Sequence, residues 1–312
     1  MQSIRRVAIV GAGLVGSGWA IVFARSGATV RVYDAEASIR ASVLDRIRAS
    51  LADMREVGLV DDVDGIAGRI TVADTLADAV SEADYIQESV FERVDVKTAI
   101  SLAIDAAMRP DAIVGSSSSG IPASAFTEGC VHRSRFLVSH PVNPPHLVPV
   151  VELVPAPWTD PDIVPFLRTE MARFGQVPVV VNREIAGFIL NRLQGALLNE
   201  AWALFEEGYA SAADIDATVA HGLGLRWSFM GPFETIDLNA PGGVADYAQR
   251  LGPLYHSVAQ DRTQPRPWSE DLVGKVAAER REALPGESLA DRRAWRDGRL
   301  MRLMAHKQAQ KD

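Results

Sequence analysis

A histidine and a glutamate twelve residues apart could together form a general base. His140 closes a short apolar run and Glu152 lies in the next, with a proline-rich turn between the two runs. A strand, a turn and a returning strand of these lengths would place the two residues side by side. The carboxylate would fix the tautomer of the imidazole and stabilise the imidazolium once it has taken up a proton. Because a lone histidine is more often structural, this interpretation depends on the rest of the chain.

A glycine-rich motif near the start of the chain predicts a dinucleotide site. The apolar run at residues 6–10 suits a buried strand, and G-x-G-x-x-G follows at once and opens a helical pattern. The first glycine permits a tight turn, the second lets a pyrophosphate approach the backbone, and the third allows close packing of helix and strand. The helix then points its first amides at the phosphates. The expected cofactor contacts are Gly11, Gly13, Leu14, Val15 and Gly16.

The acid that follows the second predicted strand, residues 29–33, favours NAD over NADP. Asp34 lies about twenty residues beyond the glycines, where a carboxylate accepts a hydrogen bond from the ribose 2′-hydroxyl. A 2′-phosphate would be repelled there, and residues 35–37 supply no adjacent Arg or Lys to hold one. The alternative is that Asp34 merely caps the next helix.

The order of the remaining elements predicts an α/β fold with a doubly wound, mostly parallel sheet of the Rossmann type. Helical stretches separate most of the further strands, which are expected at residues 70–73, 84–88, 112–115, 135–139 and 177–181. From about residue 188 the pattern is helical to the end. We therefore predict a nucleotide-binding domain at residues 1–184 and an all-helical domain at residues 185–312, which would bind substrate and form a dimer.

Polar residues that follow the predicted strands are candidates for the site, because ligands of such sheets bind beyond the carboxyl ends of the strands. Glu92 and Lys97 follow one strand, and the serines from Ser116 to Ser119 follow the next. A serine hydroxyl there could bind the substrate oxygen, but the run could equally be a solvated loop.

Two residues of the second half have open interpretations. Asn191 could position substrate or nicotinamide, or could satisfy local backbone at the start of a helix. Arg226, in a turn-rich connector, could anchor a substrate carboxylate or be a solvated or paired charge.

Composition limits the other classes of function. The net charge of −8, without long blocks of one sign, argues against a nucleic-acid binder. The single cysteine, Cys130, excludes an internal disulfide and a thiolate metal cluster, and it favours a reducing, cytoplasmic location. No segment has the pattern of a membrane span, and no residue set indicates a metal site.

Several motifs in order resemble the 3-hydroxyacyl-CoA dehydrogenase superfamily, and most closely its lambda-crystallin, or L-gulonate 3-dehydrogenase, branch. They include GAGLVGSGWAIVFA from Gly11, SHPVNPP from Ser139, EIAGFILNRLQ from Glu184 and GLGLRWSFMGPFETIDLNAPGG from Gly222. The resemblance covers nearly the whole chain and implies NAD as cofactor, a hydroxy acid substrate and a homodimer formed through the helical half.

The resemblance also implies roles for individual residues. The catalytic pair of the family matches His140 and Glu152, and its asparagine in GF-x-x-NR matches Asn191. The serine that binds the substrate oxygen matches Ser118, with Ser119 possible. The glutamate and lysine near the nicotinamide and ribose match Glu92 and Lys97, and the asparagine in the turn after the catalytic histidine matches Asn143. Ser116 and Asn143 are also expected to contact the cofactor.

Two departures from the acyl-CoA enzymes favour a small free hydroxy acid. Residues 35–68 contain no lysine and are rich in Asp and Glu, so they suit the phosphates of coenzyme A poorly. The turn reads HPVNPP, where acyl-CoA enzymes tend to have HFFNP. We predict NAD-dependent oxidation at C3 of an acid of the L-gulonate or L-3-hydroxybutyrate type. The alternatives are a 3-hydroxyacyl-CoA dehydrogenase, a carnitine-type 3-dehydrogenase, a crystallin-like protein without relevant turnover and, last, a dehydrogenase with a lysine base.

Overall fold

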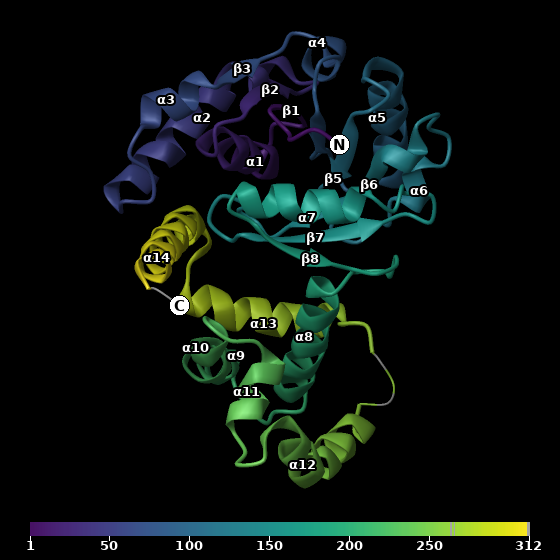
Figure 1. The fold of residues 1–312 in the computed structure, drawn as a ribbon. Helices are drawn as coiled ribbons and strands as arrows, with labels where there is room; N and C mark the ends of the chain where they lie inside the picture. Colours follow the sequence, from purple (N-terminus) through teal and green to yellow (C-terminus); the bar gives the residue numbers. More distant parts are fainter. Residues whose placement is uncertain (263, 265, 311–312) are drawn as a thin grey trace. The chain divides into compact units, whose positions relative to one another are not determined.

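An eight-stranded sheet forms the centre of the N-terminal part of the chain. A computed structural model describes residues 1–262, 264 and 266–310. The strands lie in the order β3-β2-β1-β4-β5-β6-β7-β8, and every neighbouring pair is parallel except β6 and β7. This is the predicted doubly wound sheet (Figure 1). Its strands are β1 (Arg6–Val10), β2 (Thr29–Tyr33), β3 (Ile70–Val72), β4 (Tyr85–Glu88), β5 (Ile113–Ser116), β6 (Phe136–Pro141), β7 (Val150–Pro155) and β8 (Val177–Val180).

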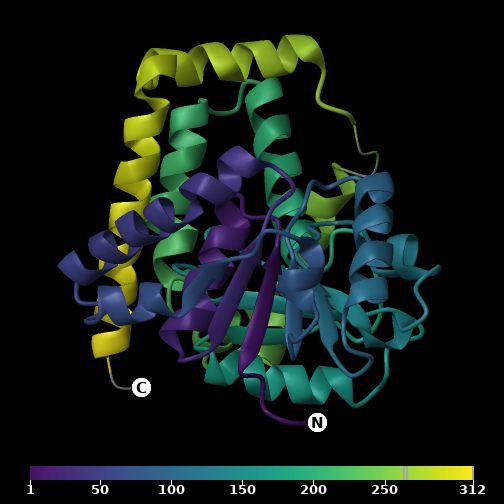
Figure 2. The ribbon, with the colours of Figure 1, turned by 90° about the horizontal axis from the view of Figure 1, so that it is seen from above.

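Helices cover both faces of the sheet because its strands are apolar on both sides. Along β1, Val7 and Ile9 pack into one apolar cluster, and Ala8 and Val10 pack into another. The first cluster includes residues of α1 (Leu14–Arg25), α2 (Ala37–Glu56), α3 (Val63–Gly68), α7 (Ile163–Arg173) and α14 (Leu289–Ala309). The second includes residues of α4 (Leu76–Val80) and α5 (Val94–Ala107), and Figure 2 shows the helices flanking the strands.

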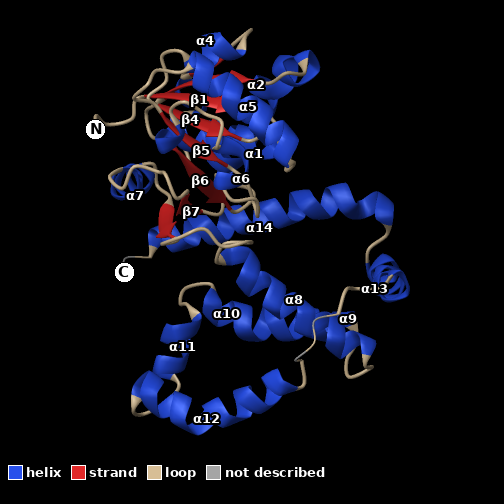
Figure 3. Ribbon diagram, turned by 90° about the vertical axis from the view of Figure 1, so that its right-hand side faces the viewer, coloured by secondary structure: helices blue, strands red, loops and turns tan. Residues whose placement is uncertain are grey.

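The remaining described elements are helical, as Figure 3 shows. These elements are α6 (Ser124–Thr127), α8 (Leu190–Glu206), α9 (Ala212–Thr218), α10 (Gly224–Trp227), α11 (Pro232–Leu238), α12 (Gly243–Gln260) and α13 (Glu270–Ala283), with the short 3-10 helices η1 (Arg133–Arg135) and η3 (Gly286–Ser288) and the π-helix η2 (Val219–Leu223). Ser211 caps the N-terminus of α9 by accepting from the backbone N–H of Asp214, and Ser269 caps α13 in the same way.

The chain divides into two compact units. The first comprises Met1–Arg192 together with the chain from Arg292 onward, and the second is Leu193–Asp291. The C-terminal helix thus returns to the first unit, where Met301 joins the apolar cluster of α1 and α2. Periodicity along the sequence gives no sign of this return, because it shows that a segment is helical but not what the helix packs against. The predicted functional boundary at residue 184 stays a prediction.

No helix in the described part of the chain is both long enough and apolar enough to cross a membrane.

Candidate active site

The loop between β1 and α1 has the geometry that a dinucleotide pyrophosphate needs. Gly11 has a φ of +95°, which favours glycine, and a Cβ at Gly16 would lie 1.9 Å from the carbonyl oxygen of Gly11. A Cβ at Gly13 would meet nothing within 4 Å, so the space before it is open. Gly13 is also the N-cap of α1 and has no side chain to satisfy the first amides, which include those of Leu14 and Val15. The described residues therefore fit the phosphates of NAD.

Asp34 is fixed at the edge of this loop. Its Oδ2 accepts from the backbone N–H of Ala12 at 2.7 Å, and its Oδ1 accepts from that of Glu36 at 2.9 Å. The carboxylate is therefore held where the turn after β2 meets the glycine-rich loop, which suits a contact with the adenosine ribose.

Sequence reasoning missed a cation at the same turn. Arg40, in the first turn of α2, donates from Nη1 to the carbonyl oxygens of Asp34 at 2.6 Å and Ala35 at 3.0 Å. Long helical side chains point back toward the helix N-terminus, so an arginine in the first turn can reach the preceding loop. This rule could have identified Arg40 from the sequence, but the search for a cation was limited to residues 35–37.

The hairpin of β6 and β7 brings the predicted base and its acid together. His140 and Glu152 are directly opposite each other in the antiparallel register, and His140 Nδ1 lies 2.7 Å from Glu152 Oε2. Both side chains are buried. His140 Nε2 makes no hydrogen bond to a described residue and is not among the buried unpartnered atoms. If Nδ1–H donates to the ionised carboxylate, Nε2 keeps its lone pair and faces accessible space.

The second oxygen of Glu152 holds the start of α8. Oε1 accepts from the backbone N–H of Ile189 at 2.8 Å and of Leu190 at 3.0 Å. The chain reaches this point through Gly187 at φ +74° and Phe188 at φ +49°, a conformation that is unusual for a phenylalanine. Phe188 is fully buried, and its ring centroid lies 5.6 Å from that of His140. The strained segment therefore places the Phe188 ring near the imidazole of His140 and directs the first backbone N–H groups of the helix toward Glu152.

These contacts keep Glu152 ionised. Burial is the largest influence on its pKa and raises it, because the charged form loses solvation. The hydrogen bonds from His140, Leu190 and Ile189 together outweigh burial and hold the pKa below its usual value. The carboxylate can thus balance the charge of a protonated His140.

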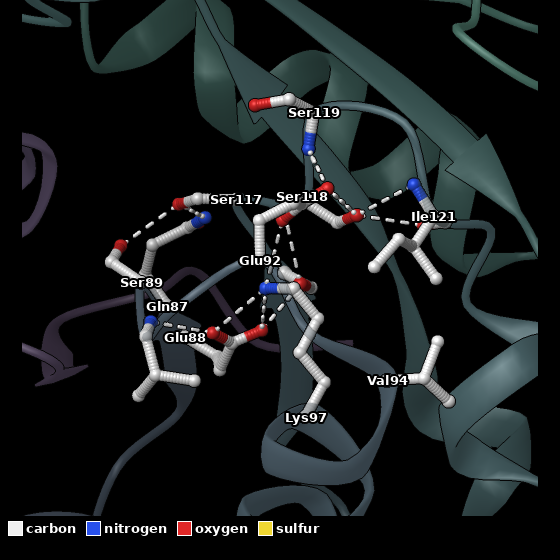
Figure 4. Close-up of polar contacts among 12 residues, drawn as sticks. Gln87, Glu88, Ser89, Glu92, Val94, Lys97, Ser117, Ser118, Ser119 and Ile121 are labelled. Atoms are coloured by element: carbon white, nitrogen blue, oxygen red, sulfur yellow. Dashed lines mark hydrogen bonds and ion pairs between the residues drawn. The ribbon is translucent and has the colours of Figure 1, made fainter.

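A buried charge cluster lies behind the predicted serine run (Figure 4). Lys97 Nζ is 3.1 Å from Glu88 Oε2 and 3.4 Å from Glu92 Oε2, and the Lys97 and Glu88 side chains are almost fully buried. Ser116 donates its hydroxyl to Glu88. Lys97 also holds the pKa of Glu92 below its usual value, against the effect of burial. Sequence analysis did not single out Glu88 for the site. It is the last residue of β4, where an acid in the sequence is typical of the solvated end of a strand.

Glu92 in turn shapes the loop of the serines. Its Oε1 accepts from the hydroxyl of Ser118 and the backbone N–H of Ser119, each at 2.8 Å, and from Gly120 N–H at 3.0 Å. Asn191 donates its side-chain amide to the carbonyl oxygen of Ser119. The predicted residues Glu92, Ser118, Ser119 and Asn191 are therefore brought together in the first unit.

The serines differ in which way their hydroxyls face. Ser118 is fully buried, and its hydroxyl oxygen also accepts from the backbone N–H of Ile121 at 3.0 Å, while Ser116 is turned into the charge cluster. Ser119 is exposed, and its hydroxyl has no partner among the described residues. Of these three serines, Ser119 is therefore the one whose hydroxyl is exposed. The predicted ligand contacts of Ser116 and Ser118 stay predictions.

The last two predicted residues lie elsewhere. Asn143 is exposed in the turn between β6 and β7. Arg226 is exposed in α10 of the second unit, and no described side chain pairs with its guanidinium. Within the described residues no group of three His, Cys, Asp or Glu side chains could hold a metal ion.

Comparison with known proteins identifies the family. Residues 6–185 match the NAD binding domain of 3-hydroxyacyl-CoA dehydrogenase, and residues 187–283 match the C-terminal domain of the same enzymes. The chain belongs to the 3-hydroxyacyl-CoA dehydrogenase family. It is an NAD-dependent dehydrogenase that acts on a CH–OH group, which confirms the predicted cofactor and reaction type.

Three relatives of this dehydrogenase are informative. It is 38% identical over 308 residues to the lambda-crystallin homolog of Homo sapiens, covering 95% of this chain and 94% of that protein. It is 35% identical over 297 residues to the L-carnitine dehydrogenase of Streptomyces coelicolor, covering 95% and 92%. The solved structure of 5-formyl-3-hydroxy-2-methylpyridine 4-carboxylic acid 5-dehydrogenase, an NAD-dependent dismutase, matches with a TM-score of 0.82 at 27% identity and covers 97% of each chain.

Proposed function

We propose that this dehydrogenase oxidises the C3 hydroxyl of a small free 3-hydroxy acid, with His140 as the base. The observation that carries the proposal is the buried hydrogen bond between His140 and an ionised Glu152, which leaves Nε2 free to accept a proton. Bound NAD supplies the hydride acceptor. As the C3–H bond gives up its electron pair, the proton of the hydroxyl passes to His140 Nε2 and the carbinol becomes a carbonyl.

The remaining residues would hold the reactants. Glu92 orders the loop that presents the hydroxyl of Ser119, and that hydroxyl would bind the reacting oxygen. Asn191 keeps its amide oxygen and one N–H free of the bond to Ser119, so it would orient the same end of the substrate. Asp34 would accept from the adenosine ribose, and Arg226 would pair with the substrate carboxylate.

Two observations support a free acid. Residues 35–68 have no lysine to hold the phosphates of coenzyme A, and one of their arginines, Arg48, already pairs with Asp64 at 3.4 Å. The relative from Streptomyces coelicolor acts on L-carnitine, a free hydroxy acid. The alternatives are a 3-hydroxyacyl-CoA substrate, for which the family is named, and a carnitine-type substrate.

A substrate panel tests the proposal. We would measure kcat/KM with NAD for L-gulonate, L-3-hydroxybutyrate, L-carnitine and 3-hydroxybutyryl-CoA. A free acid should exceed the thioester by at least about 100-fold, which corresponds to about 2.7 kcal/mol of selective transition-state binding. A higher kcat/KM for the thioester would establish the acyl-CoA alternative. His140→Ala should lose turnover while its affinity for NAD stays within about twofold.

A homodimer through the helical half is part of the same proposal. The second unit leaves large apolar side chains uncovered, among them Phe233 at 79% and Tyr209 at 72% exposure. Apolar surface of this kind typically marks a protein interface. Light scattering on the eluting protein should give twice the mass of 33.7 kDa, and a monomeric mass at micromolar concentration would contradict the dimer. A cytoplasmic location stays a prediction.

A further inference from the structure

A chain of hydrogen-bonded side chains leads from the interior of the sheet to the carboxyl end of β4, and Figure 4 shows its last members. It starts at the buried Tyr85, which donates its hydroxyl to Gln87 Oε1. Burial raises the pKa of Tyr85, so the phenol keeps this proton. Gln87 Nε2 donates to the Ser117 hydroxyl at 2.8 Å and to the carbonyl oxygen of Ser139 at 3.2 Å. Because a carbonyl oxygen can only accept, the amide nitrogen must lie on this side.

The Ser117 hydroxyl accepts two hydrogen bonds and has only its own proton left to offer. Trp19 donates its indole N–H to Ser117 Oγ at 3.2 Å, and an indole nitrogen cannot accept. Together with Gln87, this donor occupies both lone pairs of the hydroxyl oxygen. Ser117 Oγ also lies 2.8 Å from Ser89 Oγ. In an isolated pair of serines either hydroxyl could donate, but here Ser117 must donate and Ser89 must accept.

The proton of Ser89 has no acceptor in the part of the chain that the structure describes. Ser117 is the hydrogen-bond partner of Ser89 Oγ there, and the side chain of Ser89 is half-buried. Since the bond from Ser117 uses one lone pair of Ser89, the O–H of Ser89 points away from the interior of the network. Ser89 thus offers a donor whose direction is set by the buried groups behind it.

Ser89 follows β4 at the place where a dinucleotide would cross the sheet. Its backbone N–H donates to the carbonyl oxygen of Val10 at 2.7 Å, and a Cβ at Gly11 would lie 2.6 Å from Ser89 O. β4 lies on the opposite side of β1 from β2, after which Asp34 suits the adenosine ribose. Because the pyrophosphate would lie at the glycine-rich loop between them, the nicotinamide half of NAD would extend over the end of β4.

We propose that Ser89 donates its hydroxyl to a ribose or phosphate oxygen of the nicotinamide half of NAD, and that Ser117 orients this proton. Ser117 is a positioning residue, because its own proton is used on Ser89. The inference concerns how the cofactor is held. It does not depend on which hydroxy acid is oxidised or on His140 as the base.

Binding of NAD and of two of its fragments tests the contact without reference to turnover. ADP-ribose keeps the second phosphate and ribose of NAD, whereas AMP lacks both. In isothermal titration, Ser89→Ala should weaken the binding of NAD and of ADP-ribose about 3- to 10-fold, as expected for one lost hydrogen bond, and should leave AMP within about twofold. Unchanged NAD affinity, an equal loss for AMP, or a loss confined to NAD would each overturn the proposed contact.

Ser26→Ala is the matched control. Ser26 is also half-buried, but it lies at the C-terminal end of α1, and its hydroxyl is within reach of the carbonyl oxygens of Val22 and Phe174, each at 3.2 Å. This variant should bind all three ligands within about twofold of the wild type. A loss in Ser26→Ala as large as that in Ser89→Ala would mean that any lost serine hydroxyl weakens binding, and it would overturn the assignment.

A double-mutant cycle tests the orienting role of Ser117. Ser117→Ala should weaken NAD and ADP-ribose about threefold and spare AMP, and adding Ser89→Ala should then cost less affinity than it does in the wild type. Equal effects of Ser89→Ala in both backgrounds would refute the role of Ser117. Thermal melting without ligand checks that each variant folds. Ser89→Cys and Ser117→Cys keep the side-chain volume with a weak S–H donor, and they replace any alanine variant that does not fold.

Discussion

Replacing Glu152 by glutamine tests the orientation of the base most directly. The carboxylate accepts three hydrogen bonds, from His140 Nδ1 and from the backbone N–H of Ile189 and Leu190. A glutamine of nearly the same shape has one accepting oxygen and one donating NH₂ group. It can therefore satisfy either the two helix amides or the imidazole N–H, but not both.

The structure decides which orientation the amide takes. Turning its NH₂ toward the helix would leave two buried N–H groups without an acceptor, at a cost of about 1–3 kcal/mol each. Turning its NH₂ toward His140 costs less, because the imidazole can move its proton to Nε2 and accept at Nδ1. Nε2 then carries a proton and cannot take another from the substrate. We expect kcat to fall about 10²- to 10⁴-fold, the range seen when a general base is lost or held in the wrong tautomer.

The assay is steady-state kcat for Glu152→Gln beside the affinity for NAD by titration. Affinity should stay within about threefold, because Glu152 lies on β7 and not in the glycine-rich loop. Glu170→Gln is a suitable control: Glu170 is also buried and accepts from the backbone N–H of Ile4 at 2.8 Å, but it lies on α7. The control should lose stability and keep kcat. A folded Glu152→Gln enzyme with kcat within about threefold of wild type would refute the tautomer argument.

Three further predictions concern the buried pair of Lys97 and Glu88, the two acids whose pKa values are lowered, and Arg226. Lys97→Met should lower the free energy of unfolding, measured in urea, by about 3–5 kcal/mol, because it leaves the buried charge of Glu88 unpaired. The double variant Lys97→Met/Glu88→Gln should recover part of this loss. A double variant as unstable as Lys97→Met alone would contradict the role of the ion pair. The free energy of unfolding should be highest above about pH 4.5 and should fall as the pH drops below that value. The reason is that the fold lowers the pKa of Glu92 and of Glu152 from 4.5, so protonating these two carboxylates favours the unfolded chain. A free energy of unfolding that stays constant from pH 6 to pH 3 would disprove this. Arg226→Ala should raise KM for the acid about 10-fold or more with little change in kcat, and an unchanged KM would place the carboxylate anchor elsewhere.

Local rules were enough to predict the sheet and the position of the hairpin. The strands β1 and β2 begin and end at the predicted residues, since apolar runs bounded by glycine and aspartate leave little freedom in the assignment. The pairing of His140 with Glu152 also followed from the lengths of two strands and a turn, because antiparallel register is set by the residues between them. The start of α8 was predicted two residues early, because Gly187 and Phe188 adopt positive φ before the helix begins at Leu190.

The serine loop shows where such reasoning ends. The four consecutive serines cannot be told apart in the sequence, yet Ser118 is buried against Glu92 and Ser119 is exposed. Which hydroxyl faces outward depends on Glu92, and the position of Glu92 depends on the buried Lys97 and Glu88 from other elements. None of these contacts produces a periodic pattern in the sequence from which it could be predicted.

The sequence by itself thus determined the type of fold, the glycine-rich loop and the pairing of His140 with Glu152, since each depends on backbone rules that act over a few neighbouring residues. The tertiary structure alone decided that the Ser119 side chain is exposed while that of Ser118 is buried, and that Arg40 donates to the turn after β2. It also decided that the C-terminal helix belongs to the first unit. The physical reason is that hydrogen bonds and ion pairs between distant residues use up some polar groups and leave others free, and only the folded chain fixes those partners.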